Sequence, residues 1–81
     1  MNNDDNQYRP ISCELYSEFE LAIMHARKVK LVWQENAQTR IASVTPLDLR
    51  TQDHQEFLIA EDHRRQPLQI RLDYIRSHEF K

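Results

Sequence analysis

The sequence predicts a small, mainly β protein: an antiparallel β-barrel of four or five strands with one helix before it. Three observations lead to this fold class. Eighty-one residues are enough for one domain, one early stretch has apolar residues at helical spacing, and the later stretches alternate apolar and polar residues. A helix packed across one opening of a small barrel would bury the apolar residues of both the helical and the alternating stretches. We expect residues 1–7 to form a flexible leader and residues 8–81 to form the single domain.

The predicted helix covers about residues 14–27. Its apolar stripe consists of Leu15, Phe19, Ala22, Ile23 and Ala26. Burial of each large side chain on this stripe would contribute about 1.5–3 kcal/mol, which is enough to dock the helix. Ser12 and Ser17 are both candidate N-caps, and Ser17 with Glu20 has the spacing of a capping box.

Period-two alternation predicts the strands. They are expected at about residues 28–35, 39–45, 56–61, 68–73 and 75–78. The run "PLDLRTQDHQ" between the second and third strands is polar, so we expect a connection there, with Leu47 and Leu49 turned inward. The chain has no glycine, and Asn36 and Asp62 are the residues best suited to replace it where a turn needs a positive φ.

Composition argues against several classes of protein. Without glycine the chain cannot form a glycine-rich phosphate loop, and its four histidines lack the spacing of a zinc site. The lone Cys13 excludes an internal disulfide and is expected to be a small core residue. We found no catalytic constellation, so we expect a binding protein without metal or cofactor. The absence of a signal peptide or a membrane-spanning run predicts a cytoplasmic location.

Charge is distributed unevenly along the chain. Residues 1–25 hold five acids against one arginine, a net charge of −4, whereas residues 26–81 hold ten bases against eight acids. Glu14, Glu18 and Glu20 lie near the helix N-terminus, where each negative charge is favoured by about 0.3–1 kcal/mol. Repulsion between Glu14 and Glu18, four residues apart, costs a few tenths of a kcal/mol. Leu21 lies among these acids on the face turned away from the apolar stripe. The residues alone leave open whether the acids cap the helix or bind a partner.

The order of residues near the N-terminus is more specific. The stretch "YRPISCELYSEFELAIMHA" followed by "KVKLVW" resembles the opening of the Rho-binding antiterminator family (Rof). The ordered matches are Tyr8, Pro10, Ile11, Cys13, Tyr16, Glu20 and Ala22. Later segments match as well: "LDL" at 47–49, "EFL" at 56–58 and "IRLDYI" at 70–75, so that the resemblance spans about residues 8–76.

The resemblance implies an Sm-like barrel and inhibition of Rho-dependent transcription termination. Members of the family bind the N-terminal primary RNA-binding site of the Rho helicase and keep the transcript out. That site lies in an OB-fold, a surface that holds single-stranded RNA with cationic and aromatic groups, so carboxylates can take the places of phosphates. Family members act as single subunits, so the resemblance implies a monomer when the chain is free.

The expected Rho contacts follow by position. They are Glu14, Tyr16, Ser17, Glu18 and Glu20 on the helix, Leu21 beside them, and Asp48 from the connection after the second strand. Ser17 stands where relatives carry an aspartate, which removes one charge, and "QENAQT" replaces their glycine-bearing hairpin. The alternative is an Sm-like RNA-binding module that acts directly on RNA.

Overall fold

The computed structural model describes residues 8–81, so the predicted leader of residues 1–7 lies outside the described residues. Its elements are α1 (Cys13–Met24), β1 (Val29–Glu35), β2 (Gln38–Gln52), β3 (Gln55–Glu61), β4 (Pro67–Arg71), the short 3-10 helix η2 (Leu72–Tyr74) and β5 (Ile75–Phe80). The prediction of a mainly β protein with one helix is confirmed. The fourth strand ends two residues earlier than predicted because Leu72 and Asp73 belong to η2.

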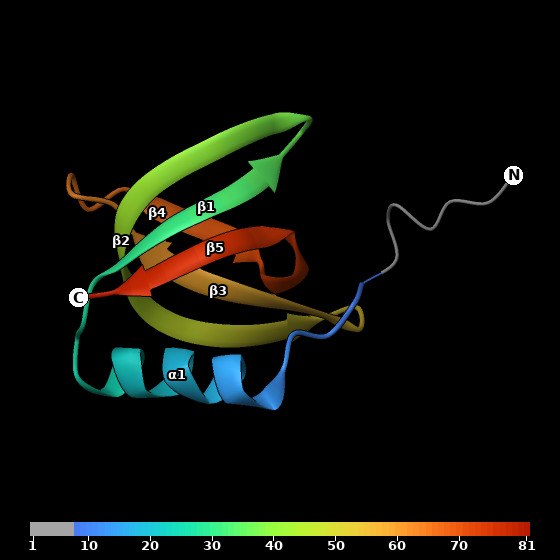
Figure 1. Ribbon diagram of the computed structural model, residues 1–81, viewed down its shortest axis with the longest axis horizontal. Coiled ribbons are helices and arrows are strands. Elements are labelled where there is room, and N and C mark those ends of the chain that lie inside the picture. The colour runs from blue at the N-terminus through green and yellow to red at the C-terminus, as the bar shows by residue number, and fades with distance from the viewer. Residues whose placement is uncertain (1–7) are drawn as a thin grey trace, which may run out of the picture.

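The five strands form one antiparallel sheet in the order β4-β3-β2-β1-β5. The sheet curls over α1, which lies across its lower side (Figure 1). Within residues 8–81, β4 and β5 are the two edges and do not pair with each other, so the predicted barrel is not closed. The turn of η2 separates these two strands, and β5 leaves it to pair with β1 instead.

β2 is much longer than predicted because the polar stretch after Thr45 continues the strand. Its first part pairs with β1 and its second part with β3. At the change of partner the register shifts: Pro46 pairs with Ala60 and Asp48 pairs with Ile59, so Leu47 is an extra residue in a β-bulge.

The bulge reverses which residues of β2 face the core. Pro46 is buried before it, and Leu49 packs against the core after it. Leu47 itself is 48% exposed. The prediction that both leucines turn inward is therefore right for Leu49 and wrong for Leu47, because one inserted residue shifts the alternation by one position.

α1 begins and ends with defined hydrogen bonds. The Ser12 hydroxyl accepts a hydrogen bond of 3.1 Å from the backbone N–H of Leu15, so Ser12 is the N-cap and the capping box predicted at Ser17 is wrong. At the other end the N–H of Arg27 donates to the carbonyl of Ala22, and the N–H of Ala26 donates to the carbonyl of Ile23. With φ of 53° at Ala26, these bonds form a Schellman motif. The helix therefore stops before Ala26, which is exposed and not part of the stripe.

The core lies between α1 and the concave side of the sheet. The buried apolar residues are Phe19, Ala22, Val29, Leu31, Trp33, Val44, Leu58, Ala60, Ile70 and Leu72. Phe19 of α1 meets Phe80 of β5 edge to face, with ring centroids 5.5 Å apart. Cys13 is exposed, so its prediction as a core residue is wrong; it is the first residue of α1 and does not share the stripe of Phe19.

Six residues other than glycine adopt a positive φ among residues 8–81: Ala26, Asn36, Ala37, Asp53, His54 and Arg65. Asn36 and Ala37 form a two-residue hairpin loop, as do Asp53 and His54, and both have the positive φ pair of a type I′ turn. The prediction is thus confirmed for Asn36. It is wrong for Asp62, because Arg65 has the positive φ in that turn.

Candidate functional site

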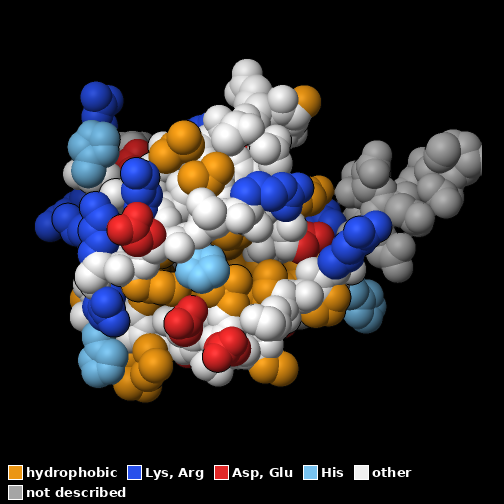
Figure 2. Space-filling view, viewed as in Figure 1, with side chains coloured by type: hydrophobic (Ala, Val, Ile, Leu, Met, Phe, Trp, Pro, Cys, Tyr) orange, Lys and Arg blue, Asp and Glu red, His pale blue; other side chains and the backbone are white. Residues whose placement is uncertain are grey.

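The helix presents most of the predicted contact residues to solvent. Glu14, Ser17, Glu18, Glu20 and Leu21 are exposed, and Tyr16 is half-buried. They are exposed because the opposite side of α1 is occupied by the packing of Phe19 and Ala22 against the sheet. In the space-filling view, acidic side chains lie over the helix at the lower side of the molecule (Figure 2).

The acids of α1 divide between two flanks of the helix. Glu18 faces β5, where its Oε1 lies 3.9 Å from Nε2 of His78. Glu20 faces β2 and lines a groove with Asp48. Two residues along a helix correspond to a rotation of about 200°, which explains the separation. The glutamates therefore flank α1 rather than form a single cluster.

The groove between α1 and β2 brings together residues that are distant in the sequence. It is lined by Tyr16, Glu20, Ile23, Met24, Asp48 and Leu49, and its volume is about 470 Å³. Asp48 enters this groove from the residue that follows the β-bulge, and it lies in a strand rather than in the predicted connection. Three of the predicted contact residues, Tyr16, Glu20 and Asp48, thus share one site.

Tyr16 is surrounded by negative charge. Partial burial is the largest cause that raises the pKa of its phenol, followed by the charges of Glu56, Glu20 and Asp48. The phenol therefore keeps its proton and remains a hydrogen-bond donor. Sequence reasoning missed Glu56, because nothing in the spacing of the third strand relates it to the helix.

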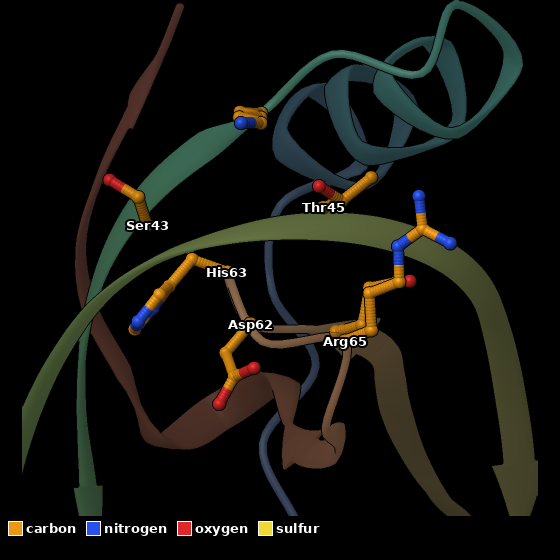
Figure 3. Close-up of a pocket in the computed structure, with 7 residues that line it drawn as sticks. Ser43, Thr45, Asp62, His63 and Arg65 are labelled. Atoms are coloured by element: carbon orange, nitrogen blue, oxygen red, sulfur yellow. The ribbon is translucent and has the colours of Figure 1, made fainter.

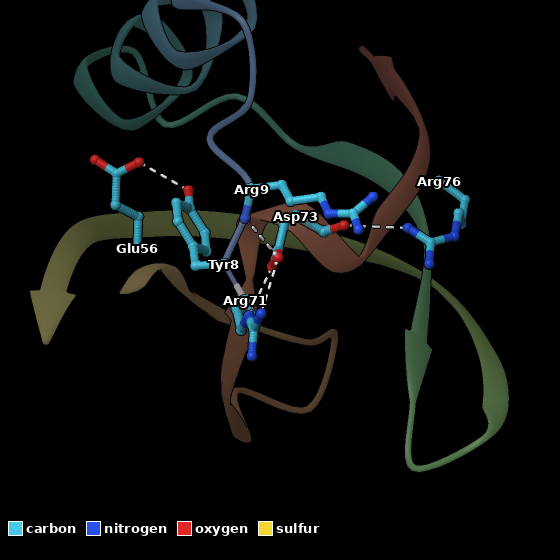
Figure 4. A network of polar contacts seen from close by, with 6 residues as sticks. All are labelled: Tyr8, Arg9, Glu56, Arg71, Asp73 and Arg76. Carbon is cyan, nitrogen blue, oxygen red and sulfur yellow. Dashed lines mark hydrogen bonds and ion pairs between the residues drawn. The ribbon is translucent and has the colours of Figure 1, made fainter. Parts of the chain in front are cut away.

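Glu56 is held in position by the chain that precedes α1. The hydroxyl of Tyr8 donates a hydrogen bond of 2.7 Å to Oε1 of Glu56 (Figure 4). Burial and this bond to a carboxylate raise the pKa of Tyr8 above its usual value. Tyr8 therefore connects the entry of α1 to β3.

Asp73 of η2 fixes the same entry segment from the other side. The backbone N–H of Arg9 donates to its Oδ2 at 3.0 Å, and the guanidinium of Arg71 donates to both oxygens at 2.7 and 2.9 Å (Figure 4). Both side chains of the Arg71–Asp73 pair are nearly buried, and the guanidinium lies 4.3 Å above the ring of Tyr74. Together, Glu56 and Asp73 hold the segment that leads into α1 against β3 and η2.

Asp48 has additional local partners. Its Oδ1 accepts a hydrogen bond of 2.8 Å from the N–H of Leu49, and its Oδ2 lies 3.7 Å from Nε of Arg50. Both members of the Arg50 pair are more than half exposed, so the arginine screens Asp48 only weakly. The groove remains a net acidic site.

In residues 8–81 no group of three or more histidine, cysteine, aspartate or glutamate side chains could hold a metal ion. In the same part of the chain no helix has both the length and the apolar character needed to cross a membrane.

No family model and no curated protein matches the sequence. Among solved structures, the fold is similar to that of Proteasome accessory factor B/C (PafBC) of Arthrobacter aurescens, with a TM-score of 0.74 and 21% sequence identity. The similarity covers 93% of this chain but 13% of that one, so the chain corresponds to a small part of PafBC. At this identity the likeness shows the fold alone.

Proposed function

We propose that this chain is a protein inhibitor of Rho-dependent transcription termination that binds the N-terminal primary RNA-binding site of Rho and blocks RNA loading. The observation that carries the proposal is the convergence of Tyr16, Glu20 and Asp48 on one groove. The resemblance to the Rho-binding antiterminators assigned these residues by position, although more than 25 residues of sequence separate Glu20 from Asp48.

The chemistry of the groove suits a partner that normally holds RNA. Carboxylates at the groove and along α1 can accept charge-assisted hydrogen bonds from the arginines that would otherwise contact phosphates. Leu21 and Met24, which are 52% and 73% exposed, add apolar area next to the acids. A polar rim beside exposed apolar side chains is the usual composition of a protein-binding surface.

The proposal includes a finer description of the fold. A short N-terminal helix on a strongly curled five-stranded sheet, with a long second strand shared by both halves, supports an Sm-like architecture. On this proposal the inhibitor acts in the cytoplasm as a monomer, without metal or cofactor, and it is not an enzyme.

The direct test is a titration of the purified protein into Rho that already holds a fluorescently labelled cytosine-rich RNA. We expect the protein to displace the RNA, and the effect to weaken with rising salt because the contacts are ionic. The double variant Glu14→Lys with Glu20→Lys should lose displacement while its circular dichroism spectrum stays unchanged.

The matched control is Glu35→Lys with Glu79→Lys, which changes the net charge equally at exposed positions outside α1. It should still displace RNA. A folded Glu14→Lys/Glu20→Lys variant that blocks termination as well as the natural sequence would refute the acidic helix as the contact. Displacement lost equally in both double variants would show an effect of net charge only.

The alternative, an Sm-like module that acts on RNA itself, predicts a different result in the same experiment. The protein would bind an oligo-pyrimidine RNA in the absence of Rho and would not bind Rho free of RNA. Measuring both interactions with the same preparation therefore separates the two functions.

A further inference from the structure

A second pocket lies outside the acidic groove, between β2 and the loop that joins β3 to β4. It has a volume of about 410 Å³ and is lined by Lys28, Ser43, Thr45, Glu61, Asp62, His63 and Arg65 (Figure 3). None of these residues takes part in the proposed contact with Rho.

Strand register explains how the pocket is assembled. Val29 and Val44 are buried and pair across β1 and β2, so the residues next to them in sequence face the outer side of the sheet. Ser43 and Thr45 are those neighbours in β2, and Lys28 immediately precedes β1. The pocket therefore has two hydroxyl groups from one strand and an ammonium group beside them.

The two fixed cations of the pocket, Lys28 and Arg65, have no hydrogen-bond or ion-pair partner for their side chains within the described part of the chain. The side chains of Lys28, His63 and Arg65 make no hydrogen bond or ion pair with another of the residues 8–81, and neither do the hydroxyls of Ser43 and Thr45. Guanidinium, ammonium and hydroxyl groups that are not engaged elsewhere are available to a ligand that accepts hydrogen bonds.

The two carboxylates of the pocket differ in their availability. Oδ1 of Asp62 accepts backbone hydrogen bonds from Gln66 at 3.0 Å and from Arg64 at 2.8 Å, and these bonds lower the pKa of Asp62. The Asp62 carboxylate is therefore engaged with the backbone of its own loop. Figure 3 shows this carboxylate pointing away from the guanidinium of Arg65, which extends beside Thr45. Glu61 is the remaining acid, against the two fixed positive charges of Lys28 and Arg65.

We propose that this pocket binds a phosphate group. The guanidinium of Arg65 and the ammonium of Lys28 donate charge-assisted hydrogen bonds to its oxygens, and the hydroxyls of Ser43 and Thr45 complete the set of donors. A metal ion does not suit the site, because its two carboxylates stand beside the fixed positive charges of Lys28 and Arg65. The proposal is independent of the Rho contact, since the two sites use different residues.

The test is a titration of the full chain with inorganic phosphate, uridine 5′-monophosphate or oligouridine, followed by backbone amide NMR shifts. We expect the largest shifts at Thr45 and around Arg65. Arg65→Gln should weaken binding about tenfold, the loss expected for a charge-assisted hydrogen bond to phosphate. Arg64→Gln removes the same charge from the neighbouring position of the same loop, does not line the pocket and should bind nearly normally.

The three ligands distinguish the source of the phosphate. Binding of all three at similar strength indicates a site for one phosphate group, and much tighter binding of oligouridine indicates the backbone of a nucleic acid; both outcomes support the proposal. Absence of shifts with every ligand, or equal weakening by Arg64→Gln and Arg65→Gln, overturns it. Displacement of RNA from Rho by the Arg65→Gln variant should be unchanged, so that either proposal can fail without the other.

Discussion

Replacing Ala26 or Ala37 with glycine should stabilise the protein, which is the opposite of the usual effect of this substitution. Both alanines have a positive φ, 53° at Ala26 and 67° at Ala37. Ala26 closes α1 in the Schellman motif, and Ala37 is the second residue of the β1–β2 hairpin loop. Glycine has no Cβ to clash in this region, and both positions are ones where it is commonly found.

The magnitude follows from two opposing terms. A left-handed conformation costs a residue with a Cβ about 1–2 kcal/mol, and glycine removes this cost. Glycine also makes the unfolded chain more flexible, which opposes folding by about 0.4–1 kcal/mol. The net gain is therefore about 0.5–1 kcal/mol at each site. The helix end and the hairpin tip lie on opposite sides of the molecule (Figure 1), so the two gains should add.

Urea denaturation followed by circular dichroism measures the free energy of unfolding. Each kcal/mol added to the free energy of unfolding should raise the melting temperature by about 4–8 °C in a domain of this size. Ala22→Gly inside α1 and Ala42→Gly inside β2 are the matched controls. Both should lower the free energy of unfolding, by about 0.5–1 kcal/mol from backbone entropy alone. If all four variants are destabilised alike, the argument from backbone conformation is wrong.

Three further predictions concern packing and the polar network. Phe19→Ala, at a fully buried position, should lower the free energy of unfolding by about 3–5 kcal/mol in urea denaturation. Asp73→Ala removes the carboxylate that pairs with the buried guanidinium of Arg71, so it should lower the free energy of unfolding by about 3–5 kcal/mol in the same assay. Loss of an exposed ion pair would cost almost nothing. The raised pKa of Tyr8 means that the unfolded chain loses the phenol proton first, so stability should fall as the pH rises above about 10. Tyr8→Phe should reduce that slope and, by removing the bond to Glu56, cost about 0.5–1.5 kcal/mol at neutral pH.

Much of the fold could be predicted because burial on one face leaves a periodic pattern. The strand at β1 follows directly from the alternation between Val29 and Trp33, and the helix follows from the stripe around Phe19. The second half of β2 could not be recognised, because the bulge at Leu47 interrupts its alternation and its exposed residues resemble a loop. Periodicity also says nothing about which strands pair, so the open edges at β4 and β5 were not foreseen.

The candidate site was only partly predictable for a similar reason. Sequence spacing placed Glu14, Glu18 and Glu20 on a helix, and α1 contains all three at exposed positions. Their division between two flanks depends on which strand each flank meets, which is a property of the assembled sheet. Glu56 of β3 acts on Tyr16 through its charge, although it lies 36 positions after Glu20 in sequence and no local pattern connects the two.

The strand order has a consequence for the way the protein folds. From β1 to β4 each strand pairs with the next one along the chain, through short hairpins that can form rapidly. The pairing of β5 with β1 instead closes a loop of about 40 residues, and its entropic cost has to be met before any contact is gained. We therefore expect a meander of four strands to form early in the folding reaction and β5 to dock late. Substitutions in β5 would then accelerate unfolding while leaving the refolding rate nearly unchanged.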